Sequence, residues 1–89
     1  MSSYIVSYDL SKPGQDYTKL YDAIKAYSWW WHYLDSTWVI VTDDSAVSIR
    51  DNLYTHMDSN DELLVAKLTG TAAWNGFEAK ASDWLKEHL

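Results

Sequence analysis

The sequence contains no cysteine, which excludes a disulfide framework and any metal site built on thiolates. No apolar run approaches the roughly 20 residues that a membrane span needs. The opening strand is too short for the apolar region of a signal peptide, and no basic leader precedes it. Internal repeats and low-complexity segments are also lacking, so no linker is expected. Together these features predict a soluble, cytoplasmic protein.

Basic residues are few. Seven Lys and Arg stand against thirteen Asp and Glu, which gives a formal net charge of -6. They are also scattered along the chain: Lys12, Lys19, Lys25, Arg50, Lys67, Lys80 and Lys86. Because this balance opposes long-range attraction to phosphates, nucleic acid is a disfavoured partner. A basic groove would have to be assembled by folding or by a dimer.

Large apolar side chains are abundant. The chain has 89 residues, of which 47% are hydrophobic, including six Trp and seven Tyr. An aromatic side chain buries on the order of 150–250 Å². A chain this short cannot divide these side chains between two cores, so residues 1–89 are expected to form one domain.

The first predicted strand is 4–9, where bulky and β-branched residues alternate. Tyr4, Val6 and Tyr8 fall on one face, and Asp9 falls on the other face at the strand exit. Both faces are largely apolar, which suits a central strand. A Pro-Gly turn within 11–15 follows, and Asp16 is a candidate N-cap for a helix. That helix has one apolar stripe: Tyr17, Leu20, Tyr21, Ile24 and Tyr27.

Two further β-prone runs, 29–34 and 37–42, flank the turn residues Asp35 and Ser36. We interpret them as a hairpin, and the alternative is one long bent strand with a bulge at Asp35 or Ser36. A second helix follows the capping residues 43–45, with Ala46, Ile49, Leu53 and Met57 on one face. Residues 58–61 break this helix before a last strand at 62–68.

The resulting order, β-α-β-β-α-β, predicts an α+β ferredoxin-like sandwich with a four-stranded antiparallel sheet over residues 3–70. The first and third strands are expected at its centre. Asn75 and Glu78 resemble a capping box for an extra C-terminal helix within 74–89. That helix is amphipathic, and it would either cover the open face of the sheet or dock on a partner subunit.

Several residues have both a structural and a functional interpretation. Consecutive strand residues point to opposite faces, so at most two of Trp29, Trp30 and Trp31 share a surface, and packing or a dimer seam is favoured over base stacking. His32 has no second histidine at ligand spacing, which favours a surface or interface position over a metal ligand or base. The acids in the turns are expected to be helix caps or solvated: Asp43, Asp44, Asp58, Asp61 and Glu62.

The layout of the chain resembles the CRISPR-associated Cas-two family and the VapD-type toxins. In this layout Tyr8-Asp9 ends the first strand, and a helix, a hairpin around Asp35-Ser36-Thr37-Trp38, a second helix and a strand follow. Over residues 3–70 it is also similar to bacterial SinR-like proteins. The resemblance implies a homodimer in which Asp9 meets its symmetry mate and holds a divalent cation such as Mg²⁺. It also implies a catalytic role for Ser36.

Three hypotheses for function therefore stay open. The first is a Cas-two-like, metal-dependent endonuclease of a defence or toxin-type system, with Asp9 as the metal ligand. The second is a non-catalytic dimeric scaffold that binds a partner protein. The third is an acidic inhibitor that imitates nucleic acid and occupies a basic site on another protein.

Overall fold

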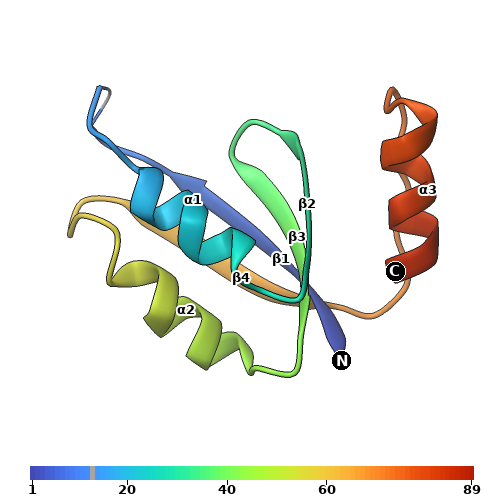
Figure 1. Ribbon diagram of the computed structural model, residues 1–89, viewed down its shortest axis with the longest axis horizontal. Coiled ribbons are helices and arrows are strands. Elements are labelled where there is room, and N and C mark those ends of the chain that lie inside the picture. Colours follow the sequence, from blue (N-terminus) through green and yellow to red (C-terminus); the bar gives the residue numbers. More distant parts are fainter. Residues whose placement is uncertain (13) are drawn as a thin grey trace.

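The computed structural model describes residues 1–12 and 14–89, and within them it is an α+β fold of one sheet and three helices (Figure 1). The elements follow in the order β1 (Ser2–Asp9), α1 (Thr18–Lys25), β2 (Trp29–Leu34), β3 (Thr37–Thr42), α2 (Ala46–Tyr54), β4 (Glu62–Leu68) and α3 (Ala79–His88). None of the helices among the described residues is long and apolar enough to cross a membrane.

The sheet has four strands in the order β2-β3-β1-β4. Every neighbouring pair is antiparallel, and the prediction that the first and third strands are central is confirmed. The hairpin interpretation of 29–42 is also confirmed, since β2 pairs with β3 across the turn at Asp35 and Ser36. A register shift lies between Trp31 and Leu34, inside β2 rather than at the turn.

One face of the sheet carries the main hydrophobic core. Helices α1 and α2 pack there, as the apolar spacing of their sequences predicts. Its fully buried members include Val6 from the sheet, Leu20 and Ile24 from α1, and Ile49 and Leu53 from α2. Since burial of each such side chain stabilises by roughly 1.5–3 kcal/mol, this face holds most of the fold's hydrophobic stabilisation.

Helix α3 covers part of the opposite face of the sheet, away from α1 and α2 (Figure 1). A second, smaller cluster is buried beneath it: Trp31, Val39, Ala81 and Leu85. Two polar contacts fix the helix, since Trp31 Nε1 donates to the Ala81 carbonyl at 3.1 Å and Ser3 Oγ donates to the His88 carbonyl at 2.6 Å. Of the two predicted roles, α3 therefore covers the sheet of its own chain.

The starts of the helices agree only in part with their predicted caps. Ser45 is the N-cap of α2, and its side chain accepts from the Ser48 N–H at 3.1 Å. Asp16 accepts from the Thr18 N–H, although Tyr17 is the N-cap of α1. The capping box predicted for α3 is wrong, because the helix begins at Ala79 after Glu78 and not at Asn75.

The predicted turn at 11–15 includes Pro13, which lies outside the described residues. Gly14 in this turn has a φ of 86°.

Candidate functional site

Asp9 is the last residue of β1, and its side chain is exposed. It lies on the same face as Ser3, which is the face that α3 partly covers. On the neighbouring strand, Glu62 is its direct cross-strand partner. Two carboxylates opposite one another repel, so this end of the sheet carries a local destabilising charge pair. A pocket of about 390 Å³ lies over it and is lined by Ser7, Tyr8, Asp9, Glu62, Leu63 and Leu64.

Ser36 lies at the same end of the sheet. It is exposed in the turn between β2 and β3, and its carbonyl accepts a hydrogen bond from the Tyr8 N–H at 3.1 Å. Ser36 therefore lies opposite Tyr8 where β1 and β3 run side by side, one residue before Asp9. The fold brings the two predicted site residues, Asp9 and Ser36, to one end of the sheet. Glu62 lies there too, although the sequence did not predict it as a site residue.

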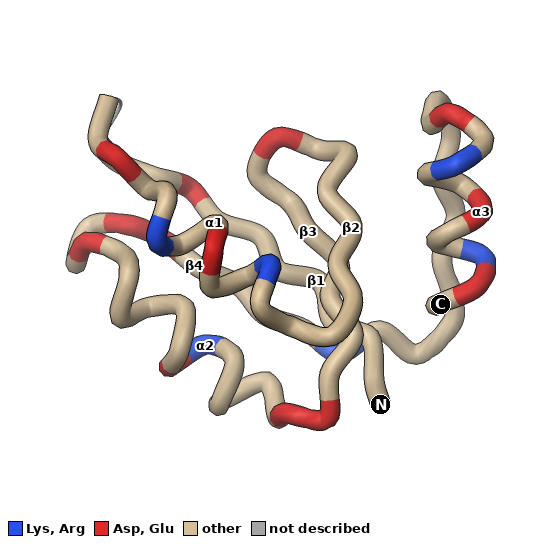
Figure 2. The backbone as a smooth tube through the Cα atoms, in the orientation of Figure 1, with Lys and Arg blue, Asp and Glu red and all other residues tan. Residues whose placement is uncertain are grey.

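The side chains of Asp9, Ser36 and Glu62 limit the chemistry that this end of the sheet can perform. Carboxylate oxygens are the ligands that Mg²⁺ prefers, so Asp9 and Glu62 fit a hard cation that keeps several waters. Within residues 1–12 and 14–89, no group of three or more His, Asp or Glu side chains is arranged to hold a metal. Acidic segments dominate this end of the molecule (Figure 2). Phosphate would approach it against like charge.

Asp61, expected in a solvated turn, is instead a buried carboxylate with 5% exposure. Its Oδ1 accepts from the Ser11 N–H at 2.8 Å, from Ser11 Oγ at 2.9 Å and from Tyr17 Oη at 3.1 Å. Its Oδ2 accepts from the Asp58 N–H at 2.9 Å. One side chain thus joins the loop after β1, the start of α1 and the turn before β4.

The ionisation of Asp61 reflects this arrangement. Burial by itself would raise the pKa of the carboxyl, but the donors from the Ser11 and Asp58 backbone and from the Ser11 and Tyr17 hydroxyls lower it to about 2. The group is therefore a permanently charged structural acceptor near neutral pH. Nearby, Lys12 Nζ lies 3.6 Å from Asp58 Oδ2, and no donor among the described residues forms a hydrogen bond to that oxygen.

The tryptophan run is divided between the two faces, as the strand alternation predicts. Trp31 is 3% exposed under α3, and Trp29 lies on the same side with its ring centroid 5.9 Å from that of His88. Trp30 lies on the other side, with Lys25 Nζ 5.4 Å from its ring centroid. His32 stacks on Trp38 at 3.7 Å between ring centroids. Packing thus accounts for Trp31, which is the interpretation favoured for the tryptophan run, whereas His32 is half-buried.

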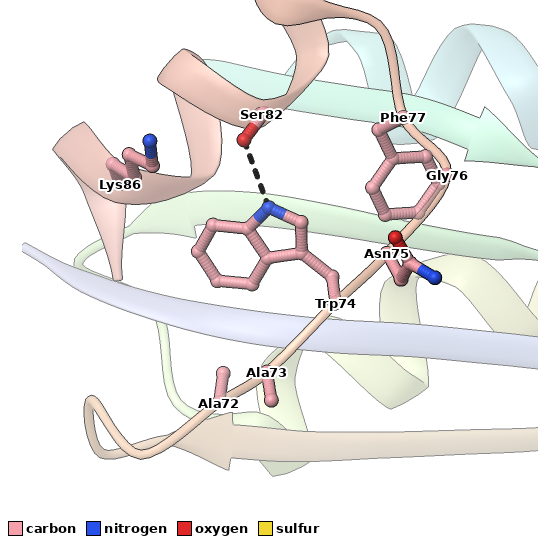
Figure 3. Close-up of a pocket in the computed structure, with 8 residues that line it drawn as sticks. All are labelled: Ala72, Ala73, Trp74, Asn75, Gly76, Phe77, Ser82 and Lys86. Carbon is pink, nitrogen blue, oxygen red and sulfur yellow. Dashed lines mark hydrogen bonds between the residues drawn. The ribbon is translucent and has the colours of Figure 1, made fainter.

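A second hollow lies on the segment that leads into α3. It has a volume of about 450 Å³, and Trp74 forms its wall with Nε1 donating to Ser82 Oγ at 2.9 Å (Figure 3). Lys86 and Asn75 supply its remaining polar groups. The indole is held by its own chain, so this hollow has one cationic and one amide group at its rim but no cluster of reactive side chains.

The outer edge of β4 is one of two exposed apolar features of the sheet; the other is β2, where Trp29, Trp30, Tyr33 and Leu34 are 42–54% exposed. β4 pairs with β1 from Ser3–Leu68 to Asp9–Glu62 without a register shift, and no further strand pairs with its outer side among the described residues. Leu64, in the middle of this strand, is 62% exposed. On the adjacent helix α2, Val47 is 56% exposed and Tyr54 is 42% exposed. We call these three residues and β4 the β4 edge surface.

Two hollows run between α2 and β4 along this surface. One, of about 300 Å³, is lined by Ala46, Val47, Arg50, Leu63, Leu64 and Val65. The other, of about 490 Å³, is lined by Arg50, Asp51, Tyr54, Asp61, Glu62 and Leu63. The sequence contained a signal for this surface, because apolar residues lie on both faces of the predicted strand 62–68. A strand at the edge of a sheet does not need apolar residues on both faces in order to fold.

Comparisons with protein-family models, with curated proteins and with solved structures give no match for this chain.

Proposed function

We propose that this protein is a ferredoxin-like, Cas-two-like module that works by binding protein, with no catalytic chemistry of its own. The strand order supports the fold assignment: from the opposite edge it is β4-β1-β3-β2, the order of two interleaved β-α-β units. The proposal includes a cytoplasmic location and a role in a defence or toxin-type system, as the resemblance to the Cas-two and VapD-type proteins implies.

The observation that carries the proposal is the β4 edge surface. Proteins usually blunt an exposed sheet edge with bulges, prolines, charged side chains or a covering element. On β4 the charged residues Glu62 and Lys67 lie near the two ends of the strand. Here the edge strand is regular, has an apolar centre and is flanked by exposed apolar residues of α2. An extended chain that added to this edge would satisfy its backbone groups and cover Leu64.

The Asp9 end supports catalysis less well. Asp9 has a carboxylate partner in Glu62, and the nearby basic residue Lys12 lies beside Asp58. A phosphodiester needs cationic contacts to bind against this charge. Trp31, the one member of the tryptophan run that is fully packed, is buried under α3 and cannot stack on a base.

A cleavage assay tests the proposal. The purified protein, incubated with single- and double-stranded RNA and DNA and Mg²⁺, is expected to show no cleavage above that of the Asp9→Asn variant. Asp51→Asn, which removes an exposed carboxylate on α2, is the matched control. Mg²⁺-dependent cleavage that Asp9→Asn abolishes and Asp51→Asn retains would overturn the assignment.

The same experiment examines the second candidate, a Mg²⁺-dependent endonuclease with Asp9 as ligand and Ser36 beside it. The pairing of Asp9 with Glu62 favours it, because each chain then supplies two carboxylates at one position. In that case Glu62→Gln should reduce cleavage along with Asp9→Asn, by at least about tenfold, because loss of even a residue that only supports a metal ligand costs about 10–100-fold.

A further inference from the structure

We infer that the uncovered part of the sheet face beside α3 binds an amphipathic helix of a partner protein, one that carries basic residues at the end nearest Asp9. This inference rests on the proposed binding function, adds a second surface to the β4 edge surface and names the chemistry of the partner. We call the uncovered part the open sheet face. It consists of six strand residues: Ile5, Ser7, Leu34, Thr37, Leu64 and Ala66.

The strand register places these residues on one side of the sheet, since directly paired residues of antiparallel strands share a face. Ile5 pairs with Val39 of β3 and with Ala66 of β4. Val39 is buried under α3, so this is the α3 side of the sheet. Thr37, two residues before Val39, faces the same side and pairs with Leu34. α3 covers only one end of this side, because β1 runs away from α3 towards its own C-terminal end (Figure 1).

The open sheet face is apolar, whereas an antiparallel sheet face in water ordinarily presents polar residues. The two exposed apolar features of the sheet meet here: Leu34 of β2 is 47% exposed, and Leu64, two residues before Ala66, is 62% exposed. A pocket of about 300 Å³ extends this apolar area beneath the segment before α3, where Trp74 and Phe77 line it. Contiguous apolar surface of this kind is typical of an interaction site.

The face of a sheet favours a helix as its occupant. The N–H and C=O groups of the strands lie in the plane of the sheet, so its face offers no backbone partner to an extended chain laid across it. A helix satisfies its own backbone groups and needs only an apolar stripe. α3 demonstrates that this side accepts a helix, because it packs there through Ala81 and Leu85. A second helix beside α3 would continue the same layer.

The charges around the open sheet face define the sign of the partner. Asp9 and Glu62 are cross-strand partners at one end of this side, and both are exposed. Lys67 is the single Lys or Arg in the four strands that the structure describes, and its pairing with Tyr4 of the main core places it on the opposite side. The acidic end is therefore not balanced by a basic strand residue on its own face. Lys or Arg side chains of the partner complement it.

The distance between the apolar and acidic parts sets the spacing in the partner helix. Ile5 and Asp9 are four residues apart on β1, which is about 13 Å along the strand. A helix rises about 1.5 Å per residue, so about nine residues, or two and a half turns, span that distance. The partner helix thus carries its apolar stripe over Ile5 and Leu64 and its basic residues about two turns further along.

Two synthetic peptides of about 18 residues test the site, a length that gives a five-turn helix. In the first, leucines recur at helical spacing on one face and lysines are confined to one end. The second has the same composition with the leucines spread around the helix. The first should bind the isotope-labelled full chain and shift the amide resonances of residues 5–9 and 62–66, while those of α1 and α2 stay in place. Equal binding by the second peptide, no binding by the first, or shifts confined to other surfaces would overturn the inference.

Three substitutions locate the contact. Leu64→Lys should weaken binding of the first peptide at least about tenfold, as loss of a central apolar contact does. Val47→Lys is the matched control, because Val47 is 56% exposed on α2 at the other side of the sheet. It adds the same charge and should change the affinity less than about threefold, the size of an exposed charge effect. Asp9→Asn should weaken binding by about two- to fivefold and reduce its dependence on salt. Equal effects of Leu64→Lys and Val47→Lys would contradict the site.

The remaining outcomes separate this site from the proposed function. Self-association of the chain that Leu64→Lys abolishes and the first peptide reverses would assign the open sheet face to a second copy and overturn the inference. A chain that neither binds the peptide nor cleaves nucleic acid would reject this site yet leave protein binding at the β4 edge surface as the function. Cleavage that depends on Asp9 would reject the function itself.

Discussion

Asp61 shows what a single residue contributes to this fold. Its carboxylate gathers donors from Ser11, Tyr17 and Asp58, and these come from three separate segments. Charge-assisted hydrogen bonds of this kind are stronger than neutral ones, and a buried donor left without an acceptor is costly. Among single substitutions of the acidic residues, Asp61→Ala should therefore cause the largest loss of stability.

The low pKa of Asp61 gives this contribution a defined pH dependence. The carboxyl has a pKa of about 2 when folded, whereas an unfolded Asp titrates at about 3.9. Between these values the unfolded chain binds more protons, so the stabilisation is complete above about pH 4 and is lost as the pH falls towards 2. The difference in melting temperature between wild type and Asp61→Asn should be large at pH 6 and should shrink through this window.

Thermal melts between pH 2 and 7 measure this difference, with Asp51→Asn as an exposed control. A difference that stays constant across the window would show that the charge of Asp61 does not supply the stabilisation.

The sequence could not identify Asp61 as a buried group. Its donors Ser11 and Tyr17 lie 50 and 44 positions away in the chain, and only the folded chain brings them together. Its sequence neighbours are Asn60 and Glu62, which look like those of any polar turn. Asp9 was easier to place, because the alternation of residues 4–9 alone defines the face and the end of the strand that carry it.

At the scale of elements, α3 differs from the other helices. It packs on a separate small cluster with Trp31 and Val39, and it buries only Ala81 and Leu85 of its own ten residues. An element with so few buried contacts opens more easily than the main core.

Leu85→Ala should therefore release α3 locally, with a loss of about 2–4 kcal/mol in the free energy that holds the helix to the sheet. Hydrogen exchange should accelerate in residues 79–88 while β1 and β3 stay protected. Leu20→Ala, in the main core, should accelerate exchange throughout the chain. Equal acceleration of α3 and the sheet by Leu85→Ala would contradict this separation.

Element boundaries were predictable where the pattern was local. The bounds of β4 agree with the predicted 62–68, and the hairpin turn lies at Asp35 and Ser36 as expected. The start of α3 was not predictable, because Asn75 and Glu78 have the spacing of a capping box. The segment before Ala79 instead lies against the fold through Trp74 and Phe77, which pack beside the smaller cluster. Tertiary packing there outweighs the local capping signal.

At the scale of the whole molecule, the two faces and two edges of the sheet have different roles. One face is filled by α1 and α2, the other is partly covered by α3, and the β2 edge is bulged. The β4 edge alone combines regular geometry with exposed apolar side chains. Hydrophobic pattern predicted the sheet, but which edge stays open depends on the strand order and the bulge. Neither property is encoded in the residues of β4 themselves.

The most direct measurement is residue-resolved amide hydrogen exchange of β4 by NMR in the isolated chain. In an open edge, every second amide of the strand points to solvent and exchanges fast. Our account predicts alternating fast and slow exchange across residues 63–67, because β4 pairs with β1 on one side only. Uniformly slow exchange across these residues would show that the β4 edge is already covered and not open to a partner, and would contradict the account.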